Sequence, residues 1–122
     1  MDNQIALSNA DYRLLDIVWD AQPIASPELC HLAEAKLGWK RTTTYTVIKR
    51  LCEKEYLKSE NTIVTSLIGR QQARRAAGRQ VLDHSFGGSL PEFVAAFLDG
   101  GTVSDKEACE IERLLEEYRR KS

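Results

Sequence analysis

The chain has 122 residues, of which 43% are hydrophobic and 29% are charged, and its formal net charge is −1 at pH 7. This composition is typical of a soluble globular protein, and the length fits one domain or a small domain with an appendage. No apolar run approaches the roughly 20 residues of a membrane-spanning helix. The first four residues lack the basic region of a signal peptide and no long apolar run follows them, so we expect a cytoplasmic protein.

The sequence contains no pattern for catalysis or metal binding. Its three cysteines, Cys30, Cys52 and Cys109, are far apart and form no Cys-x-x-Cys or Cys-x-Cys pair. A zinc site therefore lacks its usual ligand spacing. No nucleophile–base pair, metal-ligand cluster or phosphate-binding loop is present. We expect neither an enzyme nor a protein with a cofactor.

The first part of the chain predicts a helix-turn-helix unit. Ser8 is a typical N-cap residue with Asp11 three residues later, which indicates the start of a helix. Ser26 is expected to cap a second short helix, and Gly38 ends it. A short turn then leads into a third helix at 41–54. Because this last helix follows the turn, it occupies the position of a recognition helix.

Read as a helix, residues 39–52 have two different faces. One face is a buried stripe at helical spacing, formed by Thr44, Val47, Ile48, Leu51 and Cys52. The other face has hydroxyls, an aromatic ring and cations, with no acid, at Thr42, Tyr45, Thr46, Lys49 and Arg50. Such a face suits a helix that lies in the major groove of DNA. The alternative interpretation is an ordinary exposed helix with a few threonines.

Positive charge is concentrated around this helix. Residues 1–35 hold one cation and six acids, whereas residues 36–58 hold seven cations and two acids. A local excess of this kind is typical of a phosphate-binding surface, even in a protein that is nearly neutral overall.

A short β-hairpin is expected after the third helix. Residues 56–59 and 62–66 are short segments, the second rich in β-branched residues, and Glu60-Asn61 lies between them as a turn. Three helices followed by a hairpin make a winged helix, which we assign to residues 1–68. Because phosphate repels Glu60 at the tip, we expect the wing to contribute little to DNA affinity.

The rest of the chain, residues 69–122, predicts a helical dimerisation arm. Helices are expected at 70–86, at 89–98 and after Ser104, with Gly-Gly breaks between them. Three such helices cannot close a core alone, so their apolar residues need a partner, which we expect to be the same arm of a second subunit. The expected dimerisation residues are Leu90, Phe93, Val94, Phe97, Leu98, Ile111 and Leu115. The alternative is an arm that folds back on its own winged helix.

Several motifs together resemble one known family. They are Leu7-Ser8-Asn9-Ala10-Asp11-Tyr12, Gly38-Trp39 before the Thr-rich helix, and Phe86-Gly87-Gly88-Ser89-Leu90 with Val94-Ala95-Ala96-Phe97-Leu98. Over roughly residues 5–118 the sequence looks like the BlaI/MecI/CopY family of penicillinase-type repressors. The Phe-Gly-Gly-Ser-Leu segment and the apolar run after it are the most specific part of the likeness.

The resemblance implies a dimer that binds a palindromic operator and represses genes for β-lactam resistance or copper handling. In the β-lactam branch a membrane sensor–protease system cleaves the arm, and the matching bond here is Ala96–Phe97. The family's DNA-contacting positions map onto Arg41, Thr42, Thr43, Tyr45, Thr46 and Arg50.

The sequence departs from the family pattern at three informative places. The C-terminal tail has no Cys-x-Cys metal motif, which disfavours copper sensing. Ala96 stands where cleavable members have Asn, and Glu55 stands where the family commonly has Gly.

We therefore predict a mostly α-helical, homodimeric winged-helix repressor of transcription that binds a double-stranded DNA operator. The expected DNA-binding residues are Arg41, Thr42, Thr43, Tyr45, Thr46, Lys49 and Arg50. Two alternatives are a ligand-responsive winged-helix regulator, which needs an apolar pocket, and a winged helix used for protein–protein contact without DNA.

Overall fold

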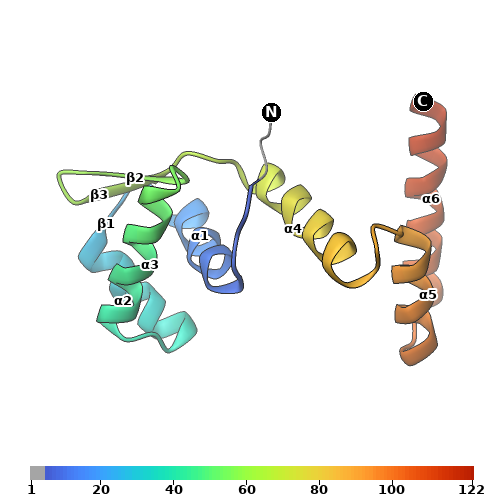
Figure 1. Cartoon of the computed structure of the whole chain (residues 1–122), viewed down its shortest axis with the longest axis horizontal. Coiled ribbons are helices and arrows are strands. Elements are labelled where there is room, and N and C mark those ends of the chain that lie inside the picture. The colour runs from blue at the N-terminus through green and yellow to red at the C-terminus, as the bar shows by residue number, and fades with distance from the viewer. Residues whose placement is uncertain (1–4) are drawn as a thin grey trace. The chain divides into compact units, whose positions relative to one another are not determined.

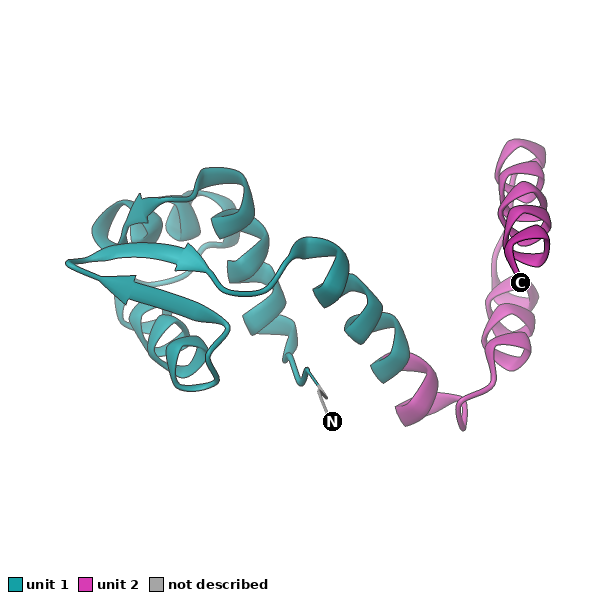
Figure 2. Ribbon diagram, turned by 90° about the horizontal axis from the view of Figure 1, so that it is seen from above, with its two compact units in different colours: residues 1–80 teal, residues 81–122 magenta. Residues whose placement is uncertain are grey.

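The computed structural model describes residues 5–122, so the first four residues of the predicted DNA-binding domain lie outside the described part. The chain forms two compact units, residues 1–80 and 81–122 (Figure 2). In chain order the elements are α1 (Asn9–Ala21), β1 (Ile24–Ala25), α2 (Ser26–Leu37), α3 (Arg41–Glu53), β2 (Leu57–Glu60), β3 (Ile63–Ser66), α4 (Arg70–Ser85), α5 (Leu90–Gly100) and α6 (Asp105–Lys121) (Figure 1). The predicted fold class, a mostly helical protein with a winged helix, is confirmed.

The ends of the first two helices follow from capping chemistry, with one correction. Ser8 and Asp11 form the predicted capping box, in which the backbone N–H of each residue donates to the side chain of the other at 3.1 Å. The second helix is capped by Ala25 without a side-chain hydrogen bond, so the prediction that Ser26 is the cap was wrong. The N–H of Ser26 instead donates to the carbonyl of Thr62 in the wing.

One apolar core joins α1, α2 and α3 to the sheet. Each helix contributes fully buried leucines, and β3 and α4 close the core with small or β-branched residues. The core residues with no measurable exposure are Leu14, Leu15, Val18, Leu29, Ala33, Leu51, Val64 and Ala73. A well-packed set of this size supports a folded domain without disulfides, and all three cysteines are free.

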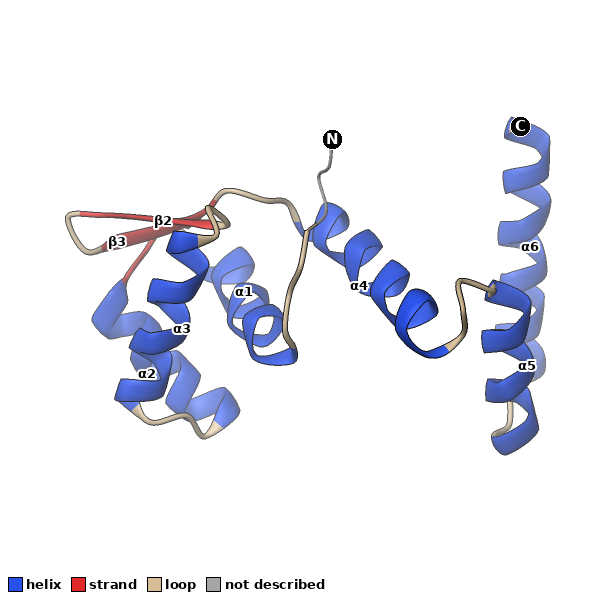
Figure 3. Cartoon of the chain, in the orientation of Figure 1, coloured by secondary structure: helices blue, strands red, loops and turns tan. Residues whose placement is uncertain are grey.

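The sheet has three antiparallel strands in the order β1-β3-β2, lying beside the helices (Figure 3). The two-residue strand β1 was not predicted, and it pairs Ile24 with Val64. The hairpin turn is Asn61-Thr62, one residue later than expected, and both residues have positive φ values of 52° and 67°. Two successive left-handed residues match the right-handed twist of a tight hairpin, which accounts for this turn.

Glu55 connects α3 to the wing in a left-handed conformation, with φ of 67°. It is the residue that stands where the resembling family commonly has Gly. A residue with a Cβ atom in this conformation costs roughly 1–2 kcal/mol relative to its ordinary conformations. The N–H groups of Glu55 and Tyr56 donate to the carbonyls of Cys52 and Leu51, so the turn is held by the end of α3.

The beginning of α4 belongs to the first unit. Ala73 is fully buried in the core. The side-chain amide of Gln80 bonds to the backbone of Leu7 in both directions, at 3.4 and 3.5 Å. Arg70 reaches Asp16 and Asp20 of α1, each at 3.1 Å. The first unit therefore extends past residue 68, where the predicted DNA-binding domain ends.

The second unit contains no buried residue. Its phenylalanine side chains contact one another, with Phe86 edge-on to Phe93 at 5.3 Å and Phe93 stacked on Phe97 at 6.4 Å. Large apolar side chains are nevertheless exposed along α5 and α6, at Leu90, Val94, Phe97, Leu98, Ile111, Leu114, Leu115 and Tyr118. Within residues 5–122, none of the helices combines the length and the apolar character needed to cross a membrane.

Candidate nucleic-acid interface

The N-terminal end of α3 is uncapped and positive. Gly38 takes a left-handed conformation with φ of 72° and ends α2, which allows the sharp turn into α3. Lys40 stands at the N-cap without a side-chain hydrogen bond, and the first turn holds no acid. The first N–H groups of a helix have no partner inside it and carry partial positive charge. With Lys40 and Arg41 beside them, these groups form a surface that favours phosphate.

The helix α3 buries one face and exposes the other, as the sequence predicted. Thr44, Val47, Ile48 and Leu51 are buried, because α3 packs against α1, α2 and β2. The exposed outer face consists of Arg41, Thr42, Thr43, Tyr45, Thr46 and Lys49. Six of the seven predicted DNA-binding residues therefore share one accessible side of a single helix.

The hydroxyl of Thr46 on this face is oriented by the helix itself. The hydroxyl of Thr46 donates to the carbonyl of Thr42 at 2.9 Å, one turn earlier. Since its proton is used there, the outward part of Thr46 is a methyl group and an oxygen that accepts. A methyl group contacts a thymine methyl, and an accepting oxygen suits the amino group of adenine or cytosine.

Tyr45 lies beside Arg41 on the outer face of α3. The guanidinium carbon of Arg41 lies 5.8 Å from the centre of the Tyr45 ring, within cation–π range. Burial raises the pKa of the Cys30 thiol on α2, while a hydrogen bond from Tyr45 and the charge of Arg41 act in the opposite direction. The side chain of Tyr45 is partly exposed.

Arg50 differs from the other predicted residues because its guanidinium is engaged inside the protein. Its Nε and Nη2 atoms donate to Oδ1 of Asp11 at 3.0 and 2.7 Å. Lys54 Nζ donates to the other oxygen of Asp11 at 3.0 Å and to the carbonyl of Ala6 at 3.2 Å. The side chain of Asp11 is fully buried, whereas those of Arg50 and Lys54 are 40% and 35% exposed. The assignment of Arg50 to phosphate stays a prediction.

The pKa of Asp11 reflects this set of contacts. Burial by itself raises the pKa of the carboxyl, but hydrogen bonds from Arg50, Lys54 and the backbone of Ser8 outweigh it, and the pKa is lowered overall. Sequence reasoning treated Asp11 only as a capping residue. Its pairing with residues 39 and 43 positions away is visible only in the fold.

The fold and this surface together define a class of protein. A helix-turn-helix with a β-hairpin wing, whose second helix presents cations and hydroxyls outward, is a winged-helix domain of the kind that binds DNA. The sequence model of the penicillinase repressor family matches residues 7–117. The chain therefore belongs to the penicillinase repressor family, whose members are transcriptional repressors and not enzymes.

The chain is also similar to several individual proteins. The chain is 23% identical to the penicillinase repressor of Staphylococcus aureus, in an alignment that covers 98% of each protein. It is 25% identical to an uncharacterised 16.5 kDa protein encoded in the ptsI 3′ region of Latilactobacillus sakei, covering 93% of this chain and 81% of that one. A solution structure of the DNA-binding domain of the repressor BlaI matches 57% of this chain and 90% of that domain, with 22% identity and a TM-score of 0.49.

The Asp11 contacts predict a pH-dependent stability. The pKa of Asp11 in the folded state is below its unfolded value of about 3.9. The ionised carboxylate therefore stabilises the fold above about pH 3.9, and this contribution to the free energy of unfolding is lost as the pH falls through the folded-state pKa. Asp11→Asn should lower the free energy of unfolding by about 1–3 kcal/mol at pH 7. The difference from the wild type should shrink below about pH 4, as measured by urea unfolding.

Asp20→Asn is the matched control on the same helix. Asp20 forms an exposed ion pair with Arg70, and such pairs contribute less than about 1 kcal/mol. If Asp11→Asn lowers the free energy of unfolding by the same amount at every pH, Asp11 is not a charged carboxylate whose pKa is lowered by folding.

Proposed function

We propose that the protein represses transcription by binding duplex DNA as a homodimer, with α3 of each subunit in the major groove. The observation that carries this proposal is the outer face of α3. Between Arg41 and Lys49 it exposes six residues able to contact phosphate or base edges and holds no acid, and it begins at an uncapped positive helix end. The exposed acid Glu53 lies at the opposite end of α3.

Position along α3 suggests a role for each part of this face. Arg41, Thr42 and Thr43 lie at the helix end, where the N–H groups favour phosphate and a side chain can reach a base edge. Tyr45 and Thr46 lie in the middle, where a recognition helix faces the bases. Lys49 lies one turn further along, is exposed, and has no ion-pair partner among the described residues, which suits a phosphate contact.

Lys49→Ala should weaken binding to every duplex alike. A lost phosphate contact lowers the salt slope of log K by about 1 per subunit, because fewer counterions are released on binding. The measurement is a titration of a fluorescent duplex across a series of salt concentrations, with Lys106→Ala on α6 as the control. An unchanged slope for Lys49→Ala would remove Lys49 from the interface.

Tyr45→Ala should alter sequence preference more than affinity for random DNA. We expect a loss of about 1–3 kcal/mol on the preferred duplex, obtained by selection from random sequences, and a small loss on random duplex. Tyr45→Phe separates the ring, which stacks on Arg41, from the hydroxyl near Cys30. Equal losses on both duplexes would reject a base-reading role for Tyr45.

The dimer is proposed from what the second unit exposes. The helices α5 and α6 bury nothing, although seven predicted dimerisation residues lie on them. Six of the seven are exposed and Phe93 is partly buried. Contiguous apolar surface of this kind is unusual on a monomer and typical of a subunit interface. Two copies related by a twofold axis would read two half-sites, which makes the operator palindromic.

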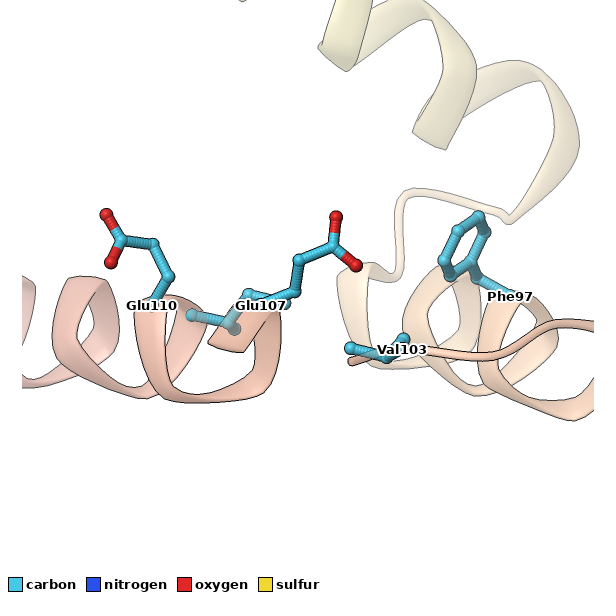
Figure 4. A pocket seen from close by; sticks show the side chains of 5 residues that line it. Phe97, Val103, Glu107 and Glu110 are labelled. Carbon is cyan, nitrogen blue, oxygen red and sulfur yellow. The ribbon is translucent and has the colours of Figure 1, made fainter. Parts of the chain in front are cut away.

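A hollow between α5 and α6 lies on this surface. It has a volume of about 230 Å³ and is lined by Phe97, Val103, Glu107, Glu110 and Ile111. Figure 4 shows the ring of Phe97 and the carboxylates of Glu107 and Glu110 extending to the same side of the two helices. We propose that a side chain of the second subunit fills the hollow, with the carboxylates at the solvated edge.

Phe97→Asp should prevent dimerisation. Phe97 is 59% exposed in the single chain, so the change does not disturb a core, but a carboxylate in an apolar interface costs about 3 kcal/mol or more. Sedimentation velocity should show monomers at concentrations where the wild type is a dimer. Thr102→Asp, an exposed change in the following turn, is the control. A stable Phe97→Asp dimer would place Phe97 outside the interface.

The family also suggests how repression ends and what is repressed. We propose genes of β-lactam resistance as targets and a sensor protease as a partner, with the Ala96–Phe97 bond as its site. Both side chains are exposed on α5. Cleavage there would separate Phe97, Leu98 and α6 from the rest of the arm, and with them most of the proposed dimer surface.

A further inference from the structure

The carboxylate of Asp11 holds two cations, Arg50 in the last turn of the recognition helix and Lys54 at its C-cap. We infer that Asp11 is a specificity-determining residue: it withholds Arg50 and Lys54 from DNA phosphate, so that less of the binding energy is independent of sequence. This inference rests on the proposed DNA-binding function of α3. The sequence led us to expect that Arg50 contacts phosphate. We infer instead that Arg50 forms an ion pair inside the protein.

The geometry around Asp11 is saturated. Oδ1 accepts from Nε and Nη2 of Arg50, while Oδ2 accepts from Lys54 Nζ and from the N–H of Ser8. A carboxylate has about four lone-pair sites, and all four are used here. The two-pronged contact with one oxygen also fixes the plane of the Arg50 guanidinium, which therefore cannot turn outward without breaking both hydrogen bonds.

Burial makes this arrangement resistant to competition from phosphate. The Asp11 side chain has no exposure. If Arg50 and Lys54 moved to phosphate, they would leave a buried carboxylate without compensation, which costs more than a solvent-exposed ion pair contributes. The remaining N–H groups of the two partly exposed cations can reach phosphate only from the positions that Asp11 imposes, and the carboxylate offsets part of their charge.

Pairing of Arg50 and Lys54 with Asp11 affects sequence specificity more than overall affinity for DNA. Phosphate contacts strengthen binding to all sequences equally, whereas base contacts distinguish them. With Arg50 and Lys54 paired to Asp11, the exposed cations of α3 that have no ion-pair partner among the described residues are Arg41 at its start and Lys49 in its third turn. Glu53 is an exposed acid at the end of the helix. The middle of the helix, with Tyr45 and Thr46, then decides which duplex is preferred.

Lys49 on α3 and Lys54 at its C-cap provide the first test. Lys49→Gln and Lys54→Gln each remove one cation, and both are assayed in the full chain for binding to a random-sequence duplex across a salt series. Lys49→Gln should lower the salt slope by about 0.9 per subunit. Lys54→Gln should leave the slope unchanged. A fall of the same size for Lys54→Gln would overturn the inference.

Releasing the cations provides the second test. Asn accepts at one atom only and presents an amide N–H₂ at the other, so Asp11→Asn should free one or both cations. The slope on random duplex should then steepen by about 0.9–1.8 per subunit, and the preference for a selected duplex should fall. In the triple variant D11N/R50Q/K54Q the slope should return to the wild-type value, because the released cations are absent.

Each outcome has a separate meaning. The inference is wrong if the Asp11→Asn variant is folded, as verified by circular dichroism, and its salt slope of DNA binding equals that of the wild type. It is also wrong if the triple variant keeps the steeper salt slope. If the Asp11→Asn variant does not fold, the comparison of the Lys49→Gln and Lys54→Gln salt slopes tests the inference. If the wild type does not bind the duplex, or Lys49→Gln does not change the slope, the proposed function of α3 fails instead.

Discussion

Burial of the apolar stripe of α3 is the constraint on which the rest of the structure depends. Val47, Ile48 and Leu51 pack into the core formed with α1, α2 and the sheet, and this packing sets which side of the helix faces outward. The ion pair of Arg50 with Asp11 then joins the later half of α3 to the start of α1. Because a packed core and a buried charge both resist rotation of the helix, the outer face is held in one orientation before DNA arrives.

The two units satisfy this requirement for burial in different ways. The first unit closes its own core, which continues into α4 through Ala73. The second unit has well-capped helices, with Ser89 and Ser104 accepting from the N–H groups of Glu92 and Glu107, yet it buries none of its large side chains. Local capping therefore decides where α5 and α6 begin, and we propose that the apolar contacts that stabilise these helices form between two subunits. Dimerisation and a palindromic operator are then one proposal, since a twofold pair of arms requires a twofold pair of half-sites.

Local patterns in the sequence predicted most of the fold, and contacts between distant residues account for what was missed. Periodicity and caps predicted the helices and the two faces of α3, because both depend on neighbours within one or two turns. The strand β1 was missed since two residues carry no period, and its partner Val64 lies 40 positions further along the chain. The pairing of Asp11 with Arg50 was missed for the same reason, and local patterns made Asp11 a cap and Arg50 a free cation. Glu55 was noticed as a departure from a family glycine, and only the backbone shows that the position is left-handed.

The central claim is that the outer face of α3 contacts duplex DNA. Its most direct test is an NMR titration of the isotopically labelled full chain with duplex DNA selected from random sequences. The account predicts that the largest amide shifts lie between Lys40 and Lys49, with small shifts at Leu29 and Val64 in the core. Shifts confined to other surfaces, with residues 40–49 unchanged at saturation, would contradict it.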